Sequence, residues 1–191
     1  MMGLEAALLE VVEFLDGNGI PYMVIGGYAN LFWGRSRVTR DIDLTVSCPA
    51  GRLQDVIARL GERFQLLPQD PLAFAKRNRV LPLFVGTVRV DLVLAGLPYE
   101  EEAIRRAQTV IVGRREVKVC APEDLVIHKV ISERPQDRED VREIIRLRGR
   151  ALDRAYMDPI VRELSAALER PDVLAFYRQC FEEVEKRRER S

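Results

Sequence analysis

The stretch Asp41-Ile42-Asp43-Leu44-Thr45-Val46 carries the clearest information in this 191-residue chain. It is an apolar run that opens with two carboxylates, and aliphatic and β-branched residues in such a run favour a strand. Side chains i and i+2 of a strand point to the same side, so Asp41 and Asp43 are expected side by side, about 6 to 7 Å apart. Carboxylates that close repel each other unless a cation lies between them. The stretch therefore predicts a cation site at the start of a strand.

A third carboxylate and a glycine pair complete this pattern. Gly26-Gly27 stands ahead of the two aspartates, and Asp91 lies inside a second apolar run. An unpaired carboxylate in a strand interior is costly, so Asp91 needs a cation or an arginine, and Arg89 shares its face if the strand is regular. Three carboxylates from two strands form the hard-oxygen site that Mg²⁺ prefers, with room for substrate phosphates. The pattern predicts metal-dependent phosphoryl chemistry, although Asp-x-Asp and Gly-Gly each also occur as ordinary turn chemistry.

The composition is that of a folded domain without a strong global charge. Hydrophobic residues make up 47% and charged residues 31%, and 30 basic side chains balance 30 acidic ones. A net charge of zero gives no overall field toward nucleic acid or anionic lipid, so any nucleic-acid contact requires a local patch. The three scattered cysteines match neither a disulfide framework nor a metal spacing, which fits a cytoplasmic protein. We predict no signal peptide and no membrane span.

The hydrophobic periodicity, together with the glycine and proline residues that interrupt helices and strands, predicts an α+β fold with two domains. The β-rich runs suggest a mixed sheet of about four or five strands flanked by helices, followed by a helical C-terminal region. We expect an α/β core at 1–121 and helices at 122–191, with 68–78 as a polar connection. The C-terminal helices are expected to start at Pro122, at Asp137 as a cap, at Asp158-Pro159 and at Pro171. The β-rich runs are 22–25, 41–46, 80–85, 88–94, 109–112 and 117–120.

A longer pattern joins these features in one order along the chain. It consists of Gly26-Gly27-Tyr28-Ala29, Gly34, Arg37, Thr39, Asp41-Ile42-Asp43-Leu44 and Asp91. The pattern resembles the DNA polymerase β-like nucleotidyltransferase superfamily over about residues 20–145. Within that superfamily the chain looks most like the bacterial abortive-infection AbiEii-type branch, which is associated with toxin-antitoxin systems. The resemblance implies a nucleotidyltransferase-like mixed sheet.

The resemblance also implies roles for the three aspartates and the two glycines. Asp41 and Asp43 would hold two Mg²⁺ ions about 3.5 to 4 Å apart, one on the triphosphate of the NTP and one on the attacking hydroxyl. Asp91 would share the second ion and help to deprotonate that hydroxyl. Gly26 and Gly27 would let the backbone approach the triphosphate, beside the amino end of a helix. The commoner superfamily motif is Gly-Ser, and Gly27 replaces the serine here, as it does in the branch that the chain resembles.

Basic residues complete the expected nucleotide site. We assign Arg37 and Arg40 to phosphate binding, with a solvated loop as an equal alternative. The branch carries a lysine followed by Asp-containing turns, matched by Lys129, Asp137 and Asp140. The resemblance therefore implies that Lys129 contacts the triphosphate, whereas Asp137 is as well explained as a helix cap.

The leading functional hypothesis is a Mg²⁺-dependent enzyme that transfers NMP from an NTP to a hydroxyl of a macromolecule. The resemblance suggests tRNA or a protein as the acceptor, and an antitoxin protein as a partner. Two alternatives stay open. One is adenylylation of a small molecule such as an antibiotic, and the other is a regulatory or antitoxin module that keeps the fold without turnover.

Overall fold

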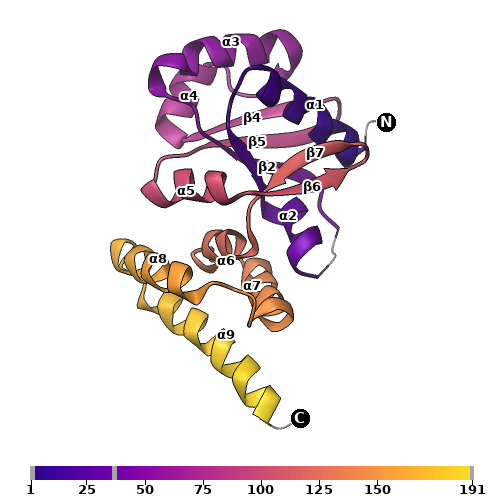
Figure 1. Cartoon of the computed structure of the whole chain (residues 1–191). Coiled ribbons are helices and arrows are strands. Elements are labelled where there is room, and N and C mark those ends of the chain that lie inside the picture. The colour runs from indigo at the N-terminus through magenta and orange to yellow at the C-terminus, as the bar shows by residue number, and fades with distance from the viewer. Residues whose placement is uncertain (1–2, 36–37, 190–191) are drawn as a thin grey trace. The chain divides into compact units, whose positions relative to one another are not determined.

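The structure is a computed structural model that describes residues 3–35 and 38–189. The described residues form two compact units (Figure 1). Of the described residues, the first unit comprises 3–28 together with 38–120, and the second comprises 29–35 together with 121–189. The boundary at residue 28 falls inside helix α2 (Gly26–Trp33).

The first unit is built on one mixed sheet of seven strands in the order β3-β4-β5-β2-β1-β7-β6. Strand β2 pairs antiparallel with β1 and parallel with β5, and β1 pairs parallel with β7. All six β-rich runs form strands, so the expected total of four or five was too low. The additional strand, β3, has only two residues, which is too short to show a periodic pattern. The strands are β1 (Tyr22–Ile25), β2 (Asp41–Val46), β3 (Gln65–Leu66), β4 (Val80–Val85), β5 (Val88–Leu94), β6 (Gln108–Val112) and β7 (Arg115–Val119).

Helices lie on both sides of this sheet, and the aspartates lie on the face opposite α1 (Leu4–Gly17) and α3 (Leu53–Arg63) (Figure 1). Helices α1 and α3 lie on one side of the sheet, and α5 (Pro98–Arg106) lies on the opposite side (Figure 1). On β2 the side chains of Ile42, Leu44 and Val46 are buried, and Val46 shares an apolar cluster with residues of α1 and α3. Because side chains alternate along a strand, Asp41 and Asp43 occupy the other face.

The segment expected as a polar connection contains a helix, α4 (Pro71–Asn78). Its boundaries follow from local chemistry. The Asp70 carboxylate accepts a hydrogen bond from the Ala73 amide at 2.9 Å, and Pro71 occupies the first turn. Arg79 ends the helix in a left-handed conformation, with φ 58°. The prediction was wrong because the helix is short and its polar residues resemble those of a loop.

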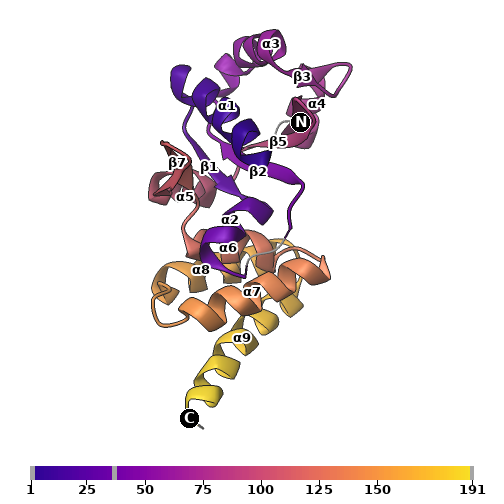
Figure 2. The same cartoon turned by 90° about the vertical axis from the view of Figure 1, so that its right-hand side faces the viewer.

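The second unit contains four consecutive helices: α6 (Pro122–Val130), α7 (Pro135–Arg148), α8 (Arg154–Ala167) and α9 (Pro171–Glu189). Helix α9 packs against α7 and α8 (Figure 2). The expected starts at Pro122 and Pro171 are confirmed. The other two were wrong, because Pro135 opens α7 and the Asp153 side chain caps α8 through the Tyr156 amide, leaving Pro159 inside that helix.

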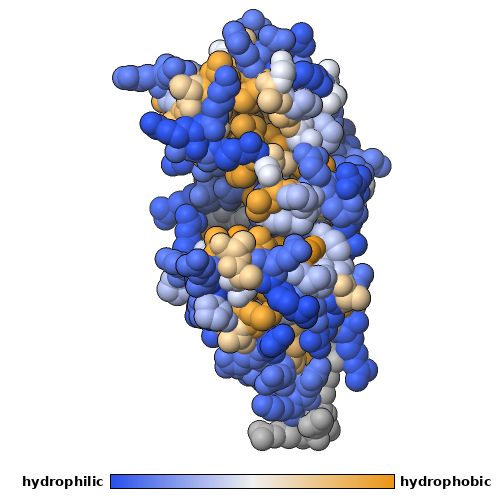
Figure 3. Space-filling view, turned by 90° about the vertical axis from the view of Figure 1, so that its left-hand side faces the viewer, coloured by the Kyte–Doolittle hydropathy of each residue, from blue (hydrophilic) through white to orange (hydrophobic). Residues whose placement is uncertain are grey.

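Hydrophilic residues cover most of the face drawn in Figure 3, and hydrophobic residues are visible between them. None of the helices in the described part of the chain combines the length and the apolar character that crossing a membrane requires.

Candidate functional site

The register of β2 and β5 brings the charged residues of the two strands together. In this parallel pair Asp43 lies opposite Asp91, and Asp41 lies opposite Arg89. Residues in register on neighbouring strands point to the same side of a sheet, a few ångströms apart. Asp41 is exposed, whereas Asp43 and Asp91 are half-buried. The sheet thus gathers three carboxylates and one guanidinium on one patch, which we call the aspartate patch.

Arg89 binds Asp91 through two hydrogen bonds. Its Nε donates to Asp91 Oδ1 at 3.0 Å, and its second guanidinium nitrogen donates to Asp91 Oδ2 at 3.2 Å. The hydrogen bond to Asp91 and the charge of that carboxylate raise the pKa of Arg89 above its ordinary value, with smaller contributions from Asp41 and Asp43. Asp91 was expected to need either a cation or an arginine; Arg89 supplies the arginine, and it carries its charge permanently.

Gly26 lies directly against the carboxylate of Asp43. Its φ is +66°, a conformation that side-chain-bearing residues rarely adopt. A Cβ atom placed on Gly26 would lie 2.1 Å from Asp43 Oδ2. Gly26 also begins helix α2, with Gly27 as its second residue, so the first amides of that helix follow immediately. The backbone at Gly26 therefore forms one wall around Asp43.

The loop before β2 contributes Thr39 and Arg40. The Thr39 hydroxyl donates to Asp41 Oδ1 at 3.0 Å, which fixes one oxygen of the outermost carboxylate. Arg40 is exposed immediately before the strand. Arg37, which the sequence assigned to phosphate binding, lies outside the described residues. In the sequence, Thr39 was recognised only as part of the longer pattern. Its hydrogen bond to Asp41 was not predicted.

Lys129 lies in the second unit, in a buried cluster of charges. Its ammonium donates to Asp137 Oδ1 and to Asp140 Oδ2, each at 2.7 Å, and only 4% of its side chain is exposed. Asn30 Nδ2 also donates a hydrogen bond to Asp140 Oδ1 at 3.3 Å. These two residues are 110 positions apart, so local sequence patterns do not predict the contact. Asp137 is not a helix cap, since it accepts from Lys129 and from the Ser132 hydroxyl. The triphosphate contact of Lys129 stays a prediction.

The pKa of Asp137 gives this cluster a testable dependence on pH. Burial raises the pKa, but hydrogen bonds from Lys129 and Ser132 outweigh it and hold the pKa below its ordinary value. A group with a lowered folded-state pKa contributes stability that is present above its unfolded pKa, about 4, and that disappears as the pH falls through the folded pKa. We expect Asp137→Asn to be less stable than the natural chain at pH 7, and its stability to fall less steeply between about pH 5 and pH 3.

Urea unfolding followed by circular dichroism at several pH values measures both effects. Asp55→Asn is the matched control, because it also removes one aspartate, but from the exposed surface of α3. If Asp137→Asn had the pH profile of the natural chain, the lowered pKa would be contradicted.

The donor chemistry of the aspartate patch suits a hard divalent cation, since three carboxylates share one face beside a glycine wall. As the side chains stand, no three histidine, cysteine or carboxylate side chains within 3–35 and 38–189 form a group that could hold a metal ion. Both oxygens of Asp91 are engaged by Arg89 instead. The three carboxylates are therefore suitable ligands for such a metal, and the strand register brings them together. The third of them, Asp91, is hydrogen-bonded to Arg89 in this structure.

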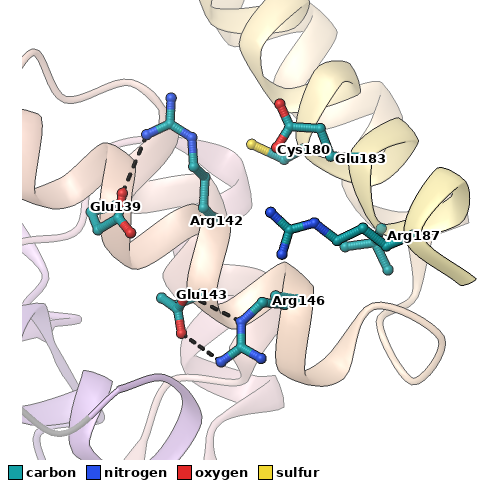
Figure 4. A pocket seen from close by; sticks show the side chains of 8 residues that line it. Glu139, Arg142, Glu143, Arg146, Cys180, Glu183 and Arg187 are labelled. Atoms are coloured by element: carbon teal, nitrogen blue, oxygen red, sulfur yellow. Dashed lines mark hydrogen bonds and ion pairs between the residues drawn. The ribbon is translucent and has the colours of Figure 1, made fainter. Parts of the chain in front are cut away.

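A cavity of about 100 Å³ lies between α7 and α9 in the second unit (Figure 4). Two of its arginines form ion pairs with neighbouring glutamates: Arg142 pairs with Glu139, and Arg146 with Glu143. Burial raises the pKa of the Cys180 thiol, which also lines the cavity, to about 11. Paired charges and a protonated thiol give this cavity no evident reactivity.

Most of the sequence matches the model of a known family. A family model described as "Nucleotidyl transferase of unknown function (DUF2204)" matches residues 4–173. No protein with a curated description matches the chain.

Several solved structures are similar in fold. An antigenic nucleotidyltransferase-like protein from Paracoccidioides brasiliensis is 17% identical, with a TM-score of 0.55 and 92% of each chain covered. The antibiotic-resistance factor ANT(2'')-Ia is 18% identical, with a TM-score of 0.55 over 86% of this chain and 94% of that one. The lincosamide antibiotic adenylyltransferase LnuA, in its lincomycin-bound structure, is 15% identical, with a TM-score of 0.50 over 72% and 94%. These similarities confirm the expected α+β, nucleotidyltransferase-like fold.

Proposed function

We propose that this chain, which belongs to that family of nucleotidyl transferases, uses Asp41, Asp43 and Asp91 to transfer NMP from an NTP to a hydroxyl group. Membership in the family confirms the predicted class of enzyme. The observation that carries the proposal is the register of β2 and β5, which sets Asp43 beside Asp91 on one face of the sheet with Gly26 against the Asp43 carboxylate.

The reaction assigns a separate task to each part of the patch. The acceptor hydroxyl attacks the α-phosphorus of the NTP, the bond between the α- and β-phosphates breaks, and pyrophosphate leaves. Asp91, the half-buried carboxylate, takes the proton of the hydroxyl. Asp41 and Asp43 orient the reacting groups, and the backbone at Gly26 and Gly27 approaches the triphosphate at the start of α2. Divalent ions held by the carboxylates, two Mg²⁺ in this proposal, would neutralise the charge that builds up on the phosphates.

The acceptor we favour is a macromolecule, either a tRNA end or a protein side chain, in a toxin-antitoxin system of the AbiEii type. Support comes from the order of motifs in the sequence, from Gly26-Gly27 to Asp91, together with Lys129 and the two aspartates that bind its ammonium. In that case a neighbouring gene encodes an antitoxin protein, and the chain acts in the cytoplasm.

We expect label from an α-³²P-labelled NTP to appear in tRNA or protein when the chain is incubated with Mg²⁺ and a cell extract. The same NTP labelled at the γ-phosphate should give no more label than the extract without the chain, whose own kinases use that phosphate, because the transfer proposed here releases the γ-phosphate in pyrophosphate. Gel separation of RNA and protein identifies the acceptor, and each of the four NTPs is tested in turn. Chelation by EDTA is the control. Added label that persists with EDTA, or γ-label above that of the extract without the chain, would contradict NMP transfer by this site.

Small-molecule adenylylation is the second candidate. The observation that favours it is the fold similarity to LnuA and ANT(2'')-Ia, whose structures are titled as an antibiotic adenylyltransferase and an antibiotic-resistance factor. The same labelling experiment separates the two candidates, because thin-layer chromatography then finds the label in a low-mass product when an antibiotic is supplied.

A further inference from the structure

Asp91, a proposed metal ligand, is already bound by a positively charged side chain, that of Arg89. Arg89 grips both oxygens of Asp91 in a fork, at 3.0 and 3.2 Å. Two parallel hydrogen bonds of this kind fix the orientation of the guanidinium relative to the carboxylate. Arg89 and Asp91 are two residues apart on β5, so they share a face by the geometry of the strand alone.

The two partners differ in how freely they can move. The Arg89 side chain is 53% exposed, whereas that of Asp91 is only 21% exposed. A long exposed side chain leaves an ion pair at small cost, because water solvates the released guanidinium and screens the pair. The half-buried carboxylate stays in register with Asp43. If the ion pair breaks, the Arg89 side chain can therefore move into solvent while Asp91 keeps its position beside Asp43.

Arg89 reduces the repulsion among the three carboxylates of the aspartate patch. Three carboxylates without a cation repel one another, and like charges directly opposite on neighbouring strands destabilise a sheet. Arg89 lies opposite Asp41 and is bound to Asp91, so it reduces the net charge of the patch from −3 to −2. The same positive charge repels an incoming divalent ion.

We propose that Arg89 is a built-in counter-cation that holds Asp91 until a divalent ion displaces it, and so weakens metal binding by the nucleotide-free protein. This inference rests on the proposed metal site of the previous subsection. It gives Arg89 a positioning role: the arginine keeps the strands of the patch together without metal, and the metal binds fully only when the nucleotide brings further phosphate ligands.

The test measures Mg²⁺ binding to the nucleotide-free protein by isothermal titration calorimetry, and by the rise in Tm with Mg²⁺ concentration. Arg89→Gln should bind Mg²⁺ about tenfold more tightly than the natural chain, because one positive charge beside the site is gone. Without Mg²⁺ its Tm should be lower, since the carboxylates then repel one another. Arg63→Gln is the matched control: it removes another exposed arginine paired at 3.0 Å, with Glu13, and should leave Mg²⁺ affinity unchanged.

The outcomes separate the two proposals. Equal Mg²⁺ affinity in Arg89→Gln and the natural chain overturns the role of Arg89 and leaves the metal site standing. Absence of Mg²⁺ binding in both overturns the metal site itself, and the inference with it. If Arg89→Gln does not fold, Arg89→Met carries the test, because it removes the same charge and keeps a long unbranched side chain at this exposed position of β5. Its Mg²⁺ affinity should also rise about tenfold, and an unchanged affinity overturns the inference.

Discussion

Replacing Asp43 with asparagine is expected to abolish NMP transfer while leaving the fold intact or more stable. The substitution keeps the size of the side chain but removes its charge at the centre of the aspartate patch, where Asp43 lies opposite Asp91. The patch would lose charge stabilisation worth several kcal/mol, so we expect kcat to fall at least about a thousandfold. The readout is the rate of label transfer from an α-³²P-labelled NTP at saturating Mg²⁺.

The Tm of Asp43→Asn shows whether the Asp43 carboxylate serves the reaction or the fold. Asp43 shares its face with Asp41 and Asp91, so removing its charge relieves repulsion among like charges. The Tm of Asp43→Asn in the absence of Mg²⁺ should therefore equal or exceed that of the natural chain. Asp55→Asn, on the exposed surface of α3, controls for the loss of one aspartate and should keep full activity. A large drop in Tm with residual activity would show that Asp43 serves the fold.

The sequence predicts those parts of this site that depend on local spacing. Asp41 and Asp43 share a face because a strand has a period of two, and Arg89 was predicted as a partner for Asp91 by the same rule. Prolines at the first turn marked the starts of α6 and α9, because a proline lacks only an amide that has no partner there.

The missed features depend on pairing across the chain or on short segments. The sequence predicted that Asp91 joins Asp41 and Asp43 from a neighbouring strand, but not that it lies opposite Asp43, because these residues are 48 positions apart and strand composition does not encode a register. The buried cluster of Lys129 spans α6 and α7, so its distances follow from helix packing and not from spacing. Strand β3 has two residues and α4 has eight, and neither length allows a hydrophobic period to emerge.

Gly26→Ala is expected to disable the site through geometry, without removing any charge. The new Cβ would lie 2.1 Å from Asp43 Oδ2, so the carboxylate or the start of α2 must move. A displacement of about 1 Å costs on the order of a hundredfold in rate when groups must be aligned for reaction. The positive φ of +66° adds a backbone cost of about 1–2 kcal/mol in stability.

Gly19→Ala separates these two effects, because the chain offers a second glycine with nearly the same backbone. Gly19 has φ +59°, and nothing lies within 4 Å of the position of its Cβ. Gly19→Ala should therefore lose a similar amount of stability in urea unfolding and keep its rate of NMP transfer. We expect Gly26→Ala alone to lose about a hundredfold in kcat, because only its methyl group reaches a carboxylate. Equal rates in the two variants would mean that the contact between Gly26 and Asp43 plays no part in the reaction.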